Sequence, residues 1–388
     1  MDPSLPMTGA GRHRPDRLIV ISDVHMAGGD SRDGFCRDEE LAGLLDALGR
    51  EARQGREETR LLVLGDLLDL FEVRDGPDGR PINPLDTSTS TALAKLRSIA
   101  RAHAVVFRAL GTLAAAGVGI DVVAGNHDLE LMRPPVQEEL CELLMEASGE
   151  AEVPAALRFY PWIYYLPGLV YAEHGSQFHD INWSPTLLRN ASNGKDVQPP
   201  VSHLLLNPRP LLETAGPLGA LRVLLRHDAL RLRPRRSGAR AEYRRQDLPA
   251  YAPQSGLAPE LLLAIDDACS VRLLPLASRL ARAIARRRGR RSGAYLKTAA
   301  AAVHGVLESA GAGVPFYLFG HSHLPERAPL FPPEPSPGYL NVGTWSRFSG
   351  FPDRLGTFVE ITPAAERPAS ARLLVWDSAA RKVRAFPP

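Results

Sequence analysis

Five short apolar runs in this 388-residue chain each lead directly into polar residues that can bind a metal ion or transfer a proton. The runs read RLIVIS, RLLVLG, GIDVVAG, LVYAE and FYLFG, and their length and composition are typical of buried β-strands. Ligands of α/β proteins bind outside the carboxyl ends of such strands. The chain is therefore expected to be an α/β protein whose strand ends converge on one site.

The polar residues after these runs are aspartate, asparagine and histidine, usually beside a glycine. In chain order they are Asp23 and His25 in SDVH, Asp66 in GDLLD, Asn126, His127 and Asp128 in GNHD, His174 in HG, and His321 and His323 in GHSH. Oxygen and imidazole donors without cysteine suit Mn, Fe, Zn or Mg. The candidate ligands are too many for one ion, so two ions that share a carboxylate fit better.

In content and order, these motifs resemble those of the calcineurin-like metallophosphoesterase superfamily, over about 17–180 and 301–362. The resemblance implies the following ligands: Asp23, His25 and His323 for one metal ion, Asn126, His174 and His321 for a second, and Asp66 as the bridge between them. It implies two divalent ions, Mn first, with Fe, Zn or Mg as alternatives. It also implies hydrolysis of a phosphoester by a hydroxide that bridges the two ions.

The same resemblance assigns catalytic roles to two residues that are not ligands. His127 is expected to protonate the leaving-group oxygen, or to stabilise the charge that develops there. Asp128 is expected to orient the His127 imidazole. By contrast, Asp69 in GDLLD is expected to cap or bond a neighbouring loop, and 179–180 to be structural.

The fold that the resemblance implies is a four-layer α/β/β/α sandwich with a helical insertion. The residues themselves predict an alternating first part, with strands and helices at 17–22, 38–53, 60–65, 88–116, 119–125 and 135–147. A hairpin is expected after Pro161, where two β-rich runs flank Pro-Gly. Later strands are predicted at 314–320, 339–343, 356–362 and 371–376. They are expected to be mostly antiparallel, because the gaps are too short for crossover helices.

Residues 17–180 and 301–388 are thus expected to form one catalytic domain, with a basic, mainly helical lid inserted at 181–300 and a disordered tail at 1–16. The insertion has 21 Lys and Arg against 8 Asp and Glu, a net charge of +13, whereas the rest of the chain carries −11. Within the insertion, 272–291 places its apolar residues on one helical face, and 233–245 is expected to be an exposed basic segment.

The charge of the insertion suggests that it has its own partner. Arginine could hold phosphate, and an apolar helix face could rest on a lipid or an anionic membrane surface. The alternative is an ordinary solvated surface. Nucleic acid is not the expected partner, because aromatic residues for base stacking are sparse there.

An inserted helical lid is also similar to the bacterial UDP-2,3-diacylglucosamine hydrolases, which cleave a pyrophosphate in a nucleotide-linked lipid. Those enzymes carry arginine where this chain has His127, and their lid is shorter. The expected substrate is therefore a phosphodiester or pyrophosphate, such as a phosphorylated small molecule or a lipid-linked nucleotide. The alternatives are a phosphomonoesterase or phosphoprotein phosphatase, and a non-enzymatic binding protein on the same scaffold.

The cysteine content and the apolar runs bear on the compartment. Cys36, Cys141 and Cys269 form no CxxC pair, which argues against both a disulfide framework and a cysteine zinc site. No secretory signal and no apolar run of about 18 residues is found. A cytoplasmic protein is expected, with peripheral contact at the inner membrane surface through 181–300.

Deleting 233–245 is expected to weaken binding to anionic liposomes, because the segment carries six of the 21 Lys and Arg of the insertion. Co-sedimentation with anionic and with zwitterionic vesicles measures this. Equal binding of the intact and the deleted chain to anionic vesicles would exclude the membrane contact.

Overall fold

The computed structural model describes residues 14–55, 57–151, 153–179, 182–184, 187–188, 198–206, 209–226, 247–248, 251–271, 294–333, 335–347, 355–363 and 368–387. Within these residues the chain is a mixed α/β protein with two mixed β-sheets. The predicted helix at 272–291, the basic segment at 233–245 and most of the tail at 1–16 lie outside the described residues.

The first sheet has the strand order β12-β11-β10-β1-β2-β3-β4. Its parallel part consists of β1 (Arg17–Ile21), β2 (Thr59–Leu64), β3 (Gly119–Val123) and β4 (Leu157–Tyr160). An antiparallel part follows, made of β10 (Thr357–Thr362), β11 (Ser370–Asp377) and β12 (Lys382–Ala385). The strands predicted from 17–22, 60–65 and 119–125 are thus neighbours, and their carboxyl ends lie at one edge.

The second sheet has the order β5-β6-β7-β9-β8, from β5 (Ile163–Leu166), β6 (Val170–Glu173), β7 (Phe316–Phe319), β8 (Glu326–Pro329) and β9 (Gly338–Asn341). The predicted hairpin is confirmed as the antiparallel pair β5–β6. The antiparallel expectation is wrong for β7, which is parallel to both β6 and β9. The chain first reaches the outer strand β8 and then turns back to insert β9 beside β7, so no crossover helix is needed.

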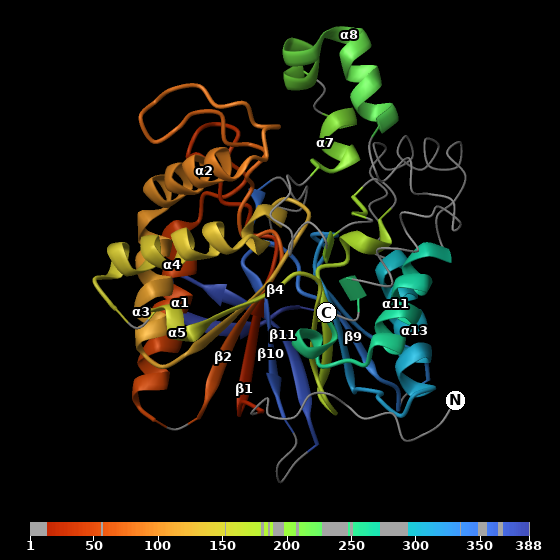
Figure 1. Ribbon diagram of the computed structural model, residues 1–388. Helices are drawn as coiled ribbons and strands as arrows, with labels where there is room; N and C mark the ends of the chain where they lie inside the picture. Colours follow the sequence, from red (N-terminus) through yellow and green to blue (C-terminus); the bar gives the residue numbers. More distant parts are fainter. Residues whose placement is uncertain are drawn as a thin grey trace.

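Helices cover the outer face of each sheet (Figure 1). The first sheet is covered by α1 (Asp38–Arg53), α2 (Thr89–Ala102), α3 (Ala104–Ala115), α4 (Pro134–Ser148) and the short α5 (Val153–Ala156). The second is covered by α11 (Pro259–Val271) and α13 (Ala294–Glu308), while α7 (Val201–Leu206) and α8 (Arg209–Arg226) project beyond the strand ends. None of the described helices is long and apolar enough to cross a membrane.

Strand periodicity explains why the sheets pack against each other and against helices. In β1, Leu18 and Val20 belong to a buried cluster that also contains Leu318 of β7 and Leu340 of β9. The alternate residues of β1, such as Ile19, belong to the cluster formed with the helices. Because successive side chains of a strand point to opposite faces, both faces of β1 are buried and its sequence is continuously apolar.

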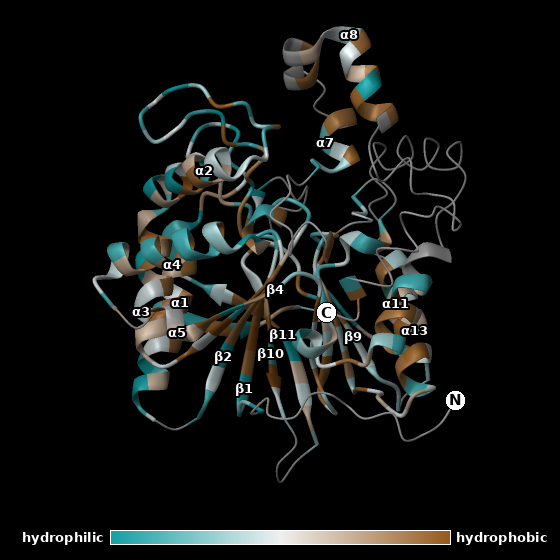
Figure 2. Cartoon of the chain, viewed as in Figure 1, coloured by the Kyte–Doolittle hydropathy of each residue, from teal (hydrophilic) through white to brown (hydrophobic). Residues whose placement is uncertain are grey.

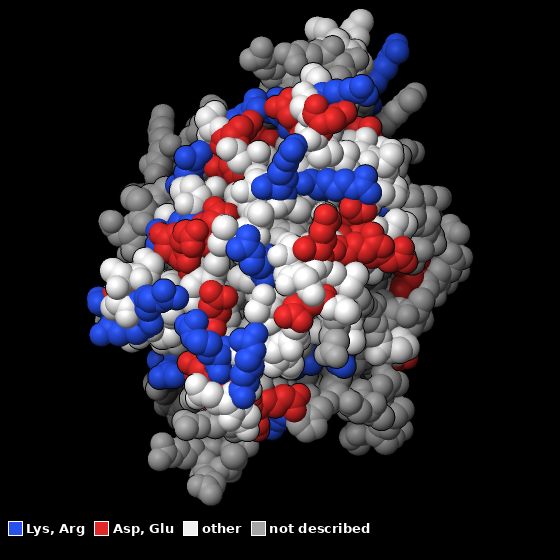
Figure 3. Space-filling model, turned by 90° about the vertical axis from the view of Figure 1, so that its left-hand side faces the viewer, with Lys and Arg blue, Asp and Glu red and all other residues white. Residues whose placement is uncertain are grey.

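The outer surface of the helices over the first sheet carries both signs of charge, closely mixed (Figure 3). Arg97 of α2, for example, donates two hydrogen bonds of 2.7 and 2.8 Å to the Glu139 carboxylate of α4. This pattern is that of an ordinary solvated surface. It differs from the strongly one-sided charge of the inserted sequence at 181–300.

The helix predicted at 88–116 is two helices, because the chain breaks at His103. The His103 imidazole is buried and contacts Asp38 of α1 at 2.8 Å and Asp33 at 2.9 Å. Asp33 in turn accepts hydrogen bonds from the backbone N–H groups of Ala27, Gly29 and Phe35. His103 therefore fixes the loop that follows Asp23 and His25.

Burial opposes protonation of His103, but the hydrogen bonds to Asp33 and Asp38 raise its pKa to about 9. An unfolded histidine has a pKa of about 6.5, so this stabilisation is fully present below pH 6.5 and is lost as the pH rises towards 9. His103→Phe should remove a contribution on the order of 3 kcal/mol at pH 6 and much less at pH 9.5. Urea unfolding across this range measures the difference from wild type. A difference that does not change with pH would contradict the prediction, and His304→Phe is the control.

Candidate metal centre

The predicted site residues all follow strands whose carboxyl ends meet where the two sheets adjoin. The His321 backbone N–H, after β7, donates to both oxygens of Asp23, after β1, at 2.9 and 3.1 Å. The Asp23 carbonyl accepts from Trp345 N (3.1 Å) and Thr344 Oγ1 (2.7 Å), beyond β9. The turn NVGTW at 341–345 therefore lies against the site.

A first donor cluster consists of Asp23, His25 and His323. His323 Nε2 lies 3.1 Å from Asp23 Oδ1 and 3.1 Å from His25 Nε2. Asp23 and His25 are buried, and His323 is half-buried. These are the three residues predicted to hold the first metal ion.

A second cluster consists of Asp66, His174 and His321, with Asn126 beside them. His174 Nδ1 is 3.0 Å from the Leu64 carbonyl, so it carries the proton and donates it there. Nε2 faces Asp66 Oδ2 at 3.1 Å and Asn126 Oδ1 at 3.2 Å. When His174 is neutral, these three atoms are all lone-pair donors and repel one another unless a cation lies between them, so this donor set fits a metal ion.

Asp66 lies between the two clusters. Its Oδ2 is 3.1 Å from His174 Nε2 in the second cluster and 3.6 Å from His25 Nε2 in the first. Its Oδ1 accepts a hydrogen bond of 2.9 Å from the His127 backbone N–H. This position is the one that a bridging ligand would require.

The charges of the site also favour a bound cation. Burial alone would raise the pKa of Asp66, but the imidazoles of His174 and His127 hold it well below its ordinary value. Burial opposes protonation of His174, but the carboxylates of Asp66 and Asp23 raise its pKa to about 9. The buried carboxylates thus draw positive charge into the site, either as protons or as metal ions.

The backbone of the site is strained at the predicted ligands. The described residues include six non-glycine positions with positive φ, and five of these are Asp23 (53°), His25 (60°), Asp66 (53°), His321 (62°) and His323 (60°). Such residues cost free energy, on the order of 1 kcal/mol or more each, and concentrate at functional sites. In the site, these positive-φ residues direct the side chains of the short loops towards the donor clusters.

The glycines of the motifs allow close approach. A Cβ at Gly65 would lie 2.5 Å from His174 Nδ1, and a Cβ at Gly125 would overlap the Asp66 carboxylate. A Cβ at Gly320 would overlap the Ser22 hydroxyl and lie 2.5 Å from Asp23 Oδ2. The glycine in GD, GN and GH is therefore needed because a ligand from another loop occupies the space of its side chain.

The expected role of Asp128 is wrong, and Asp69 lies in its place. The Asp128 carboxylate accepts hydrogen bonds from the backbone of Gly125 (2.7 Å), Leu67 (2.7 Å) and Leu68 (3.3 Å), so it joins two loops. Asp69 Oδ2 lies 3.0 Å from His127 Nδ1 and 3.3 Å from His25 Nδ1. Asp69, expected to be a cap, is thus the carboxylate that can orient both imidazoles.

Two further histidines lie close to the predicted site. His203 of α7 packs edge-on against His127, with ring centroids 4.5 Å apart, and also contacts Phe71. Burial, followed by the neighbouring His127, lowers the pKa of His203 to about 3. His179, expected to be structural, lies 2.8 Å from His321, and Asp180 is outside the described residues. No local motif marks His203, because its position depends on how α7 packs, whereas His179 follows the HG motif through the short turn Ser176–Phe178.

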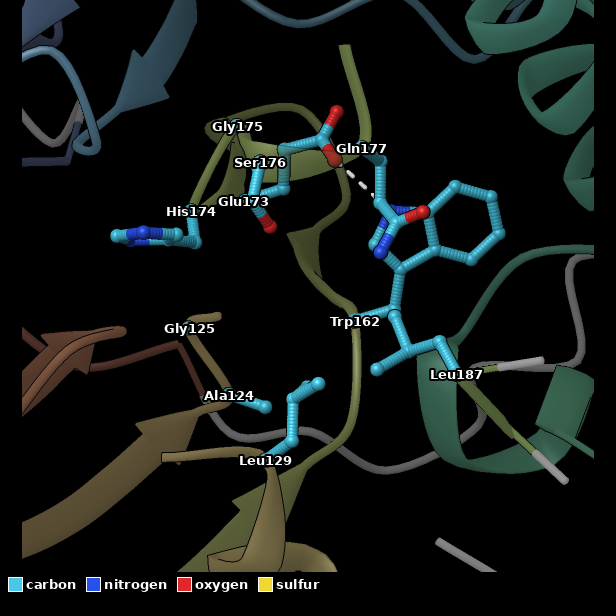
Figure 4. Close-up of a pocket in the computed structure, with 10 residues that line it drawn as sticks. All are labelled: Ala124, Gly125, Leu129, Trp162, Glu173, His174, Gly175, Ser176, Gln177 and Leu187. Atoms are coloured by element: carbon cyan, nitrogen blue, oxygen red, sulfur yellow. Dashed lines mark hydrogen bonds between the residues drawn. The ribbon is translucent and has the colours of Figure 1, made fainter. Parts of the chain in front are cut away.

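At the end of β6, Glu173 and His174 point in opposite directions (Figure 4). The Glu173 carboxylate accepts hydrogen bonds of 2.8 Å from Trp162 Nε1 and from the Tyr171 hydroxyl. Burial raises the pKa of Glu173 to about 7. This network supports the strand from the side away from the donor clusters, while His174 faces them.

Gly125→Ala should displace Asp66 and destabilise the protein by about 1–3 kcal/mol. Both metal affinities should fall together, because Asp66 lies between the two clusters. Metal content after dialysis and thermal unfolding measure these effects. Gly305→Ala on α13, where a Cβ would meet no atom within 4 Å, is the matched control. Unchanged metal content in Gly125→Ala would contradict the placement of Asp66.

No protein-family model and no curated protein sequence matches the chain. Among solved structures, the chain is similar to phosphopantetheinyl hydrolase from Mycobacterium tuberculosis, with 11% sequence identity and a TM-score of 0.25. The match covers 87% of this chain and 90% of that one. At this TM-score and identity, the similarity supports no conclusion about what this chain does.

Proposed function

We propose that this chain is a dinuclear metal-dependent phosphoester hydrolase with the four-layer sandwich of the calcineurin-like metallophosphoesterases. The observation that carries the proposal is the pair of buried donor clusters with Asp66 between them. Asp23, His25 and His323 would hold one ion, Asn126, His174 and His321 the other, with Mn²⁺ first and Fe, Zn or Mg as alternatives. When bound, two such ions supply Lewis-acid stabilisation of phosphoryl oxygens and lower the pKa of water.

The residues of the chain itself act on the leaving group. His127 is not part of either ligand set, and its side chain is 19% exposed, so it can reach a substrate oxygen. Asp69 Oδ2 lies 3.0 Å from Nδ1 of the same ring, so its negative charge faces that edge of the imidazole. Burial opposes protonation of His127, but Asp69 and Asp66 raise its pKa, which favours the form that can donate a proton.

The exposed apolar surface of helices α7 and α8 favours an amphiphilic substrate. Both helices lie beyond the strand ends and are coloured partly as hydrophobic (Figure 2). Their large exposed apolar side chains are Leu205, Leu212, Leu218, Leu221, Val223 and Leu225. His203 of α7 at the same time contacts His127. A phosphodiester or pyrophosphate with an apolar group could bind with its phosphate at the donor clusters and its apolar part along these helices.

Removing a metal-binding side chain should strongly lower the activity. Asp66→Asn and Asn126→Ala should each lower kcat/KM at least about 100-fold in Mn-loaded protein, because each removes a donor of the second ion. The exposed Asn83→Ala is the control. Activity that persists in both variants would exclude the metal mechanism.

The role of His127 depends on the leaving group. His127→Ala should slow hydrolysis of an alkyl phosphodiester about 100-fold or more, but slow a p-nitrophenyl ester much less, because p-nitrophenolate leaves without a proton. Metal content should stay unchanged. Equal losses with both leaving groups would contradict general acid catalysis.

The class of ester is tested on the wild type. Bis-p-nitrophenyl phosphate is expected to be hydrolysed faster than p-nitrophenyl phosphate at equal concentration. Clear preference for the monoester would favour the alternative, a phosphomonoesterase.

A further inference from the structure

Helix α7 belongs to the inserted segment, yet it brings an imidazole against the ring of His127. The His203 ring packs edge-on against that ring, with centroids 4.5 Å apart and planes at 76°. His25 packs against the same ring at 4.6 Å and 85°. Asp69 Oδ2 faces its Nδ1 at 3.0 Å. Three side chains from three separate segments therefore surround the His127 imidazole.

The orientation of the His127 ring decides whether it can protonate a leaving group. Nδ1 faces Asp69, so Nε2 is the nitrogen that remains for a substrate oxygen. A general acid has to lie within hydrogen-bond reach of the atom that it protonates, and a small displacement costs rate. Without the His203 ring, the His127 ring could move into the vacated space and carry Nε2 away from that position.

The His203 ring is itself held by residues that precede the insertion. Phe71, near the end of the GD loop, is buried and contacts the His203 ring at a centroid distance of 4.8 Å. The buried Lys95 ammonium lies 5.6 Å from the Phe71 ring centroid and donates to the carbonyls of Pro84 and Asp86, both at 2.8 Å. The surface that receives His203 is therefore fixed by hydrogen bonds of its own.

The neighbour of His203 on α7 anchors the helix on both sides. Leu204 is buried in a small apolar cluster with Leu211 and Ala220 of α8. Leu85, which precedes the insertion in the chain, packs against the same cluster. Helix α7 is thus packed against α8 and against the loop that contains Leu85, and this packing sets the position of the His203 ring.

The His203 imidazole is uncharged where it meets His127. Burial, followed by the neighbouring His127, lowers the pKa of His203 to about 3. A second cation beside His127 would oppose its protonation, whereas a neutral ring can pack against the protonated form. His203 therefore restrains the ring of the general acid without discharging it.

We propose that His203 is a positioning residue, which holds the His127 ring with Nε2 towards the leaving-group oxygen. This inference rests on the proposed function, because His203 acts through the general acid of that reaction. It gives the insertion a direct part in catalysis, since α7 then completes the leaving-group side of the site. Loss of the ring should lower kcat for substrates that need the proton and leave KM nearly unchanged.

The test compares Mn-loaded wild type, His203→Ala and His203→Phe on two diesters. The phenolate of diphenyl phosphate needs a proton more than the p-nitrophenolate of bis-p-nitrophenyl phosphate does. His203→Ala should lower kcat about tenfold for the first diester and less than about twofold for the second, with unchanged metal content. His203→Phe keeps a ring in the same place and should restore most of the lost rate.

His304→Ala is the matched control. His304 is also half-buried and contacts two rings, those of Tyr317 and Phe331, but it lies on α13 outside both donor clusters. Its replacement should leave the ratio of the two rates as it is in wild type. A shift of that ratio in His304→Ala as large as in His203→Ala would overturn the inference.

A double mutant shows whether His203 acts through His127. In a His127→Ala background, His203→Ala should change kcat for diphenyl phosphate less than about twofold, because the group that it positions is gone. A loss of about tenfold in both backgrounds would overturn the inference, since His203 would then act independently of His127.

Further outcomes separate this inference from the proposed function. Wild type without metal-dependent hydrolysis of either diester would overturn the proposed function. Wild type that hydrolyses both, with His203→Ala equally active, would overturn the positioning role alone. If His203→Ala loses cooperative unfolding, His203→Gln, which keeps the size but not the ring, takes its place. A loss confined to diphenyl phosphate would then support the inference, and equal losses with both diesters would overturn it.

Discussion

The carboxylate of Asp23 is the contact on which the two sheets and the site both depend. It follows β1 of the first sheet, accepts the His321 N–H of the second, and lies 3.1 Å from His323. Ser22 Oγ donates to the same carboxylate at 2.5 Å and is also 2.8 Å from the Leu64 carbonyl at the end of β2. A buried carboxylate is stable only where donors or cations surround it. The strand ends therefore have to meet here, and the site forms where they meet.

Bringing the ligand loops together strains their backbone, and the two sheets have to hold this strained conformation. Five predicted ligands have positive φ, and the neighbouring glycines leave no room for a side chain. Strained residues persist only where the surrounding structure holds them. Here the strands are buried on both faces, and the loops bond to each other, as Asp23 N does to Gly65 O (3.1 Å) and His25 N to Asp66 O (2.9 Å). Metal binding would offset part of this strain energy, because an ion that binds only the folded state stabilises it.

Much of this arrangement could be predicted from the sequence, because strand ends and their polar residues are local features. Continuous apolar runs identified the central strands, and the residues after them are those that the fold brings together. Contacts between loops were harder. Asp128 stands beside His127 in the sequence, yet Asp69 from the next loop faces its ring. Adjacent residues in an irregular loop need not point to the same side, so proximity in sequence was a poor guide.

Features that depend on long-range packing could not be predicted. His103 breaks the helix at 88–116 through contacts with Asp33 and Asp38, which lie far away in the sequence. Similarly, β9 is inserted beside β7 because β8 takes the outer place in the sheet. His203 reaches the site only because α7 packs over it, and no periodicity or motif in that helix predicts the contact.

The central claim is that two metal ions bind side by side with Asp66 between them. Anomalous diffraction from crystals of the Mn-loaded protein tests it most directly. Two peaks should appear, one against Asp23, His25 and His323 and one against Asn126, His174 and His321, with Asp66 in contact with both. A single peak, or peaks that Asp66 does not touch, would contradict the claim.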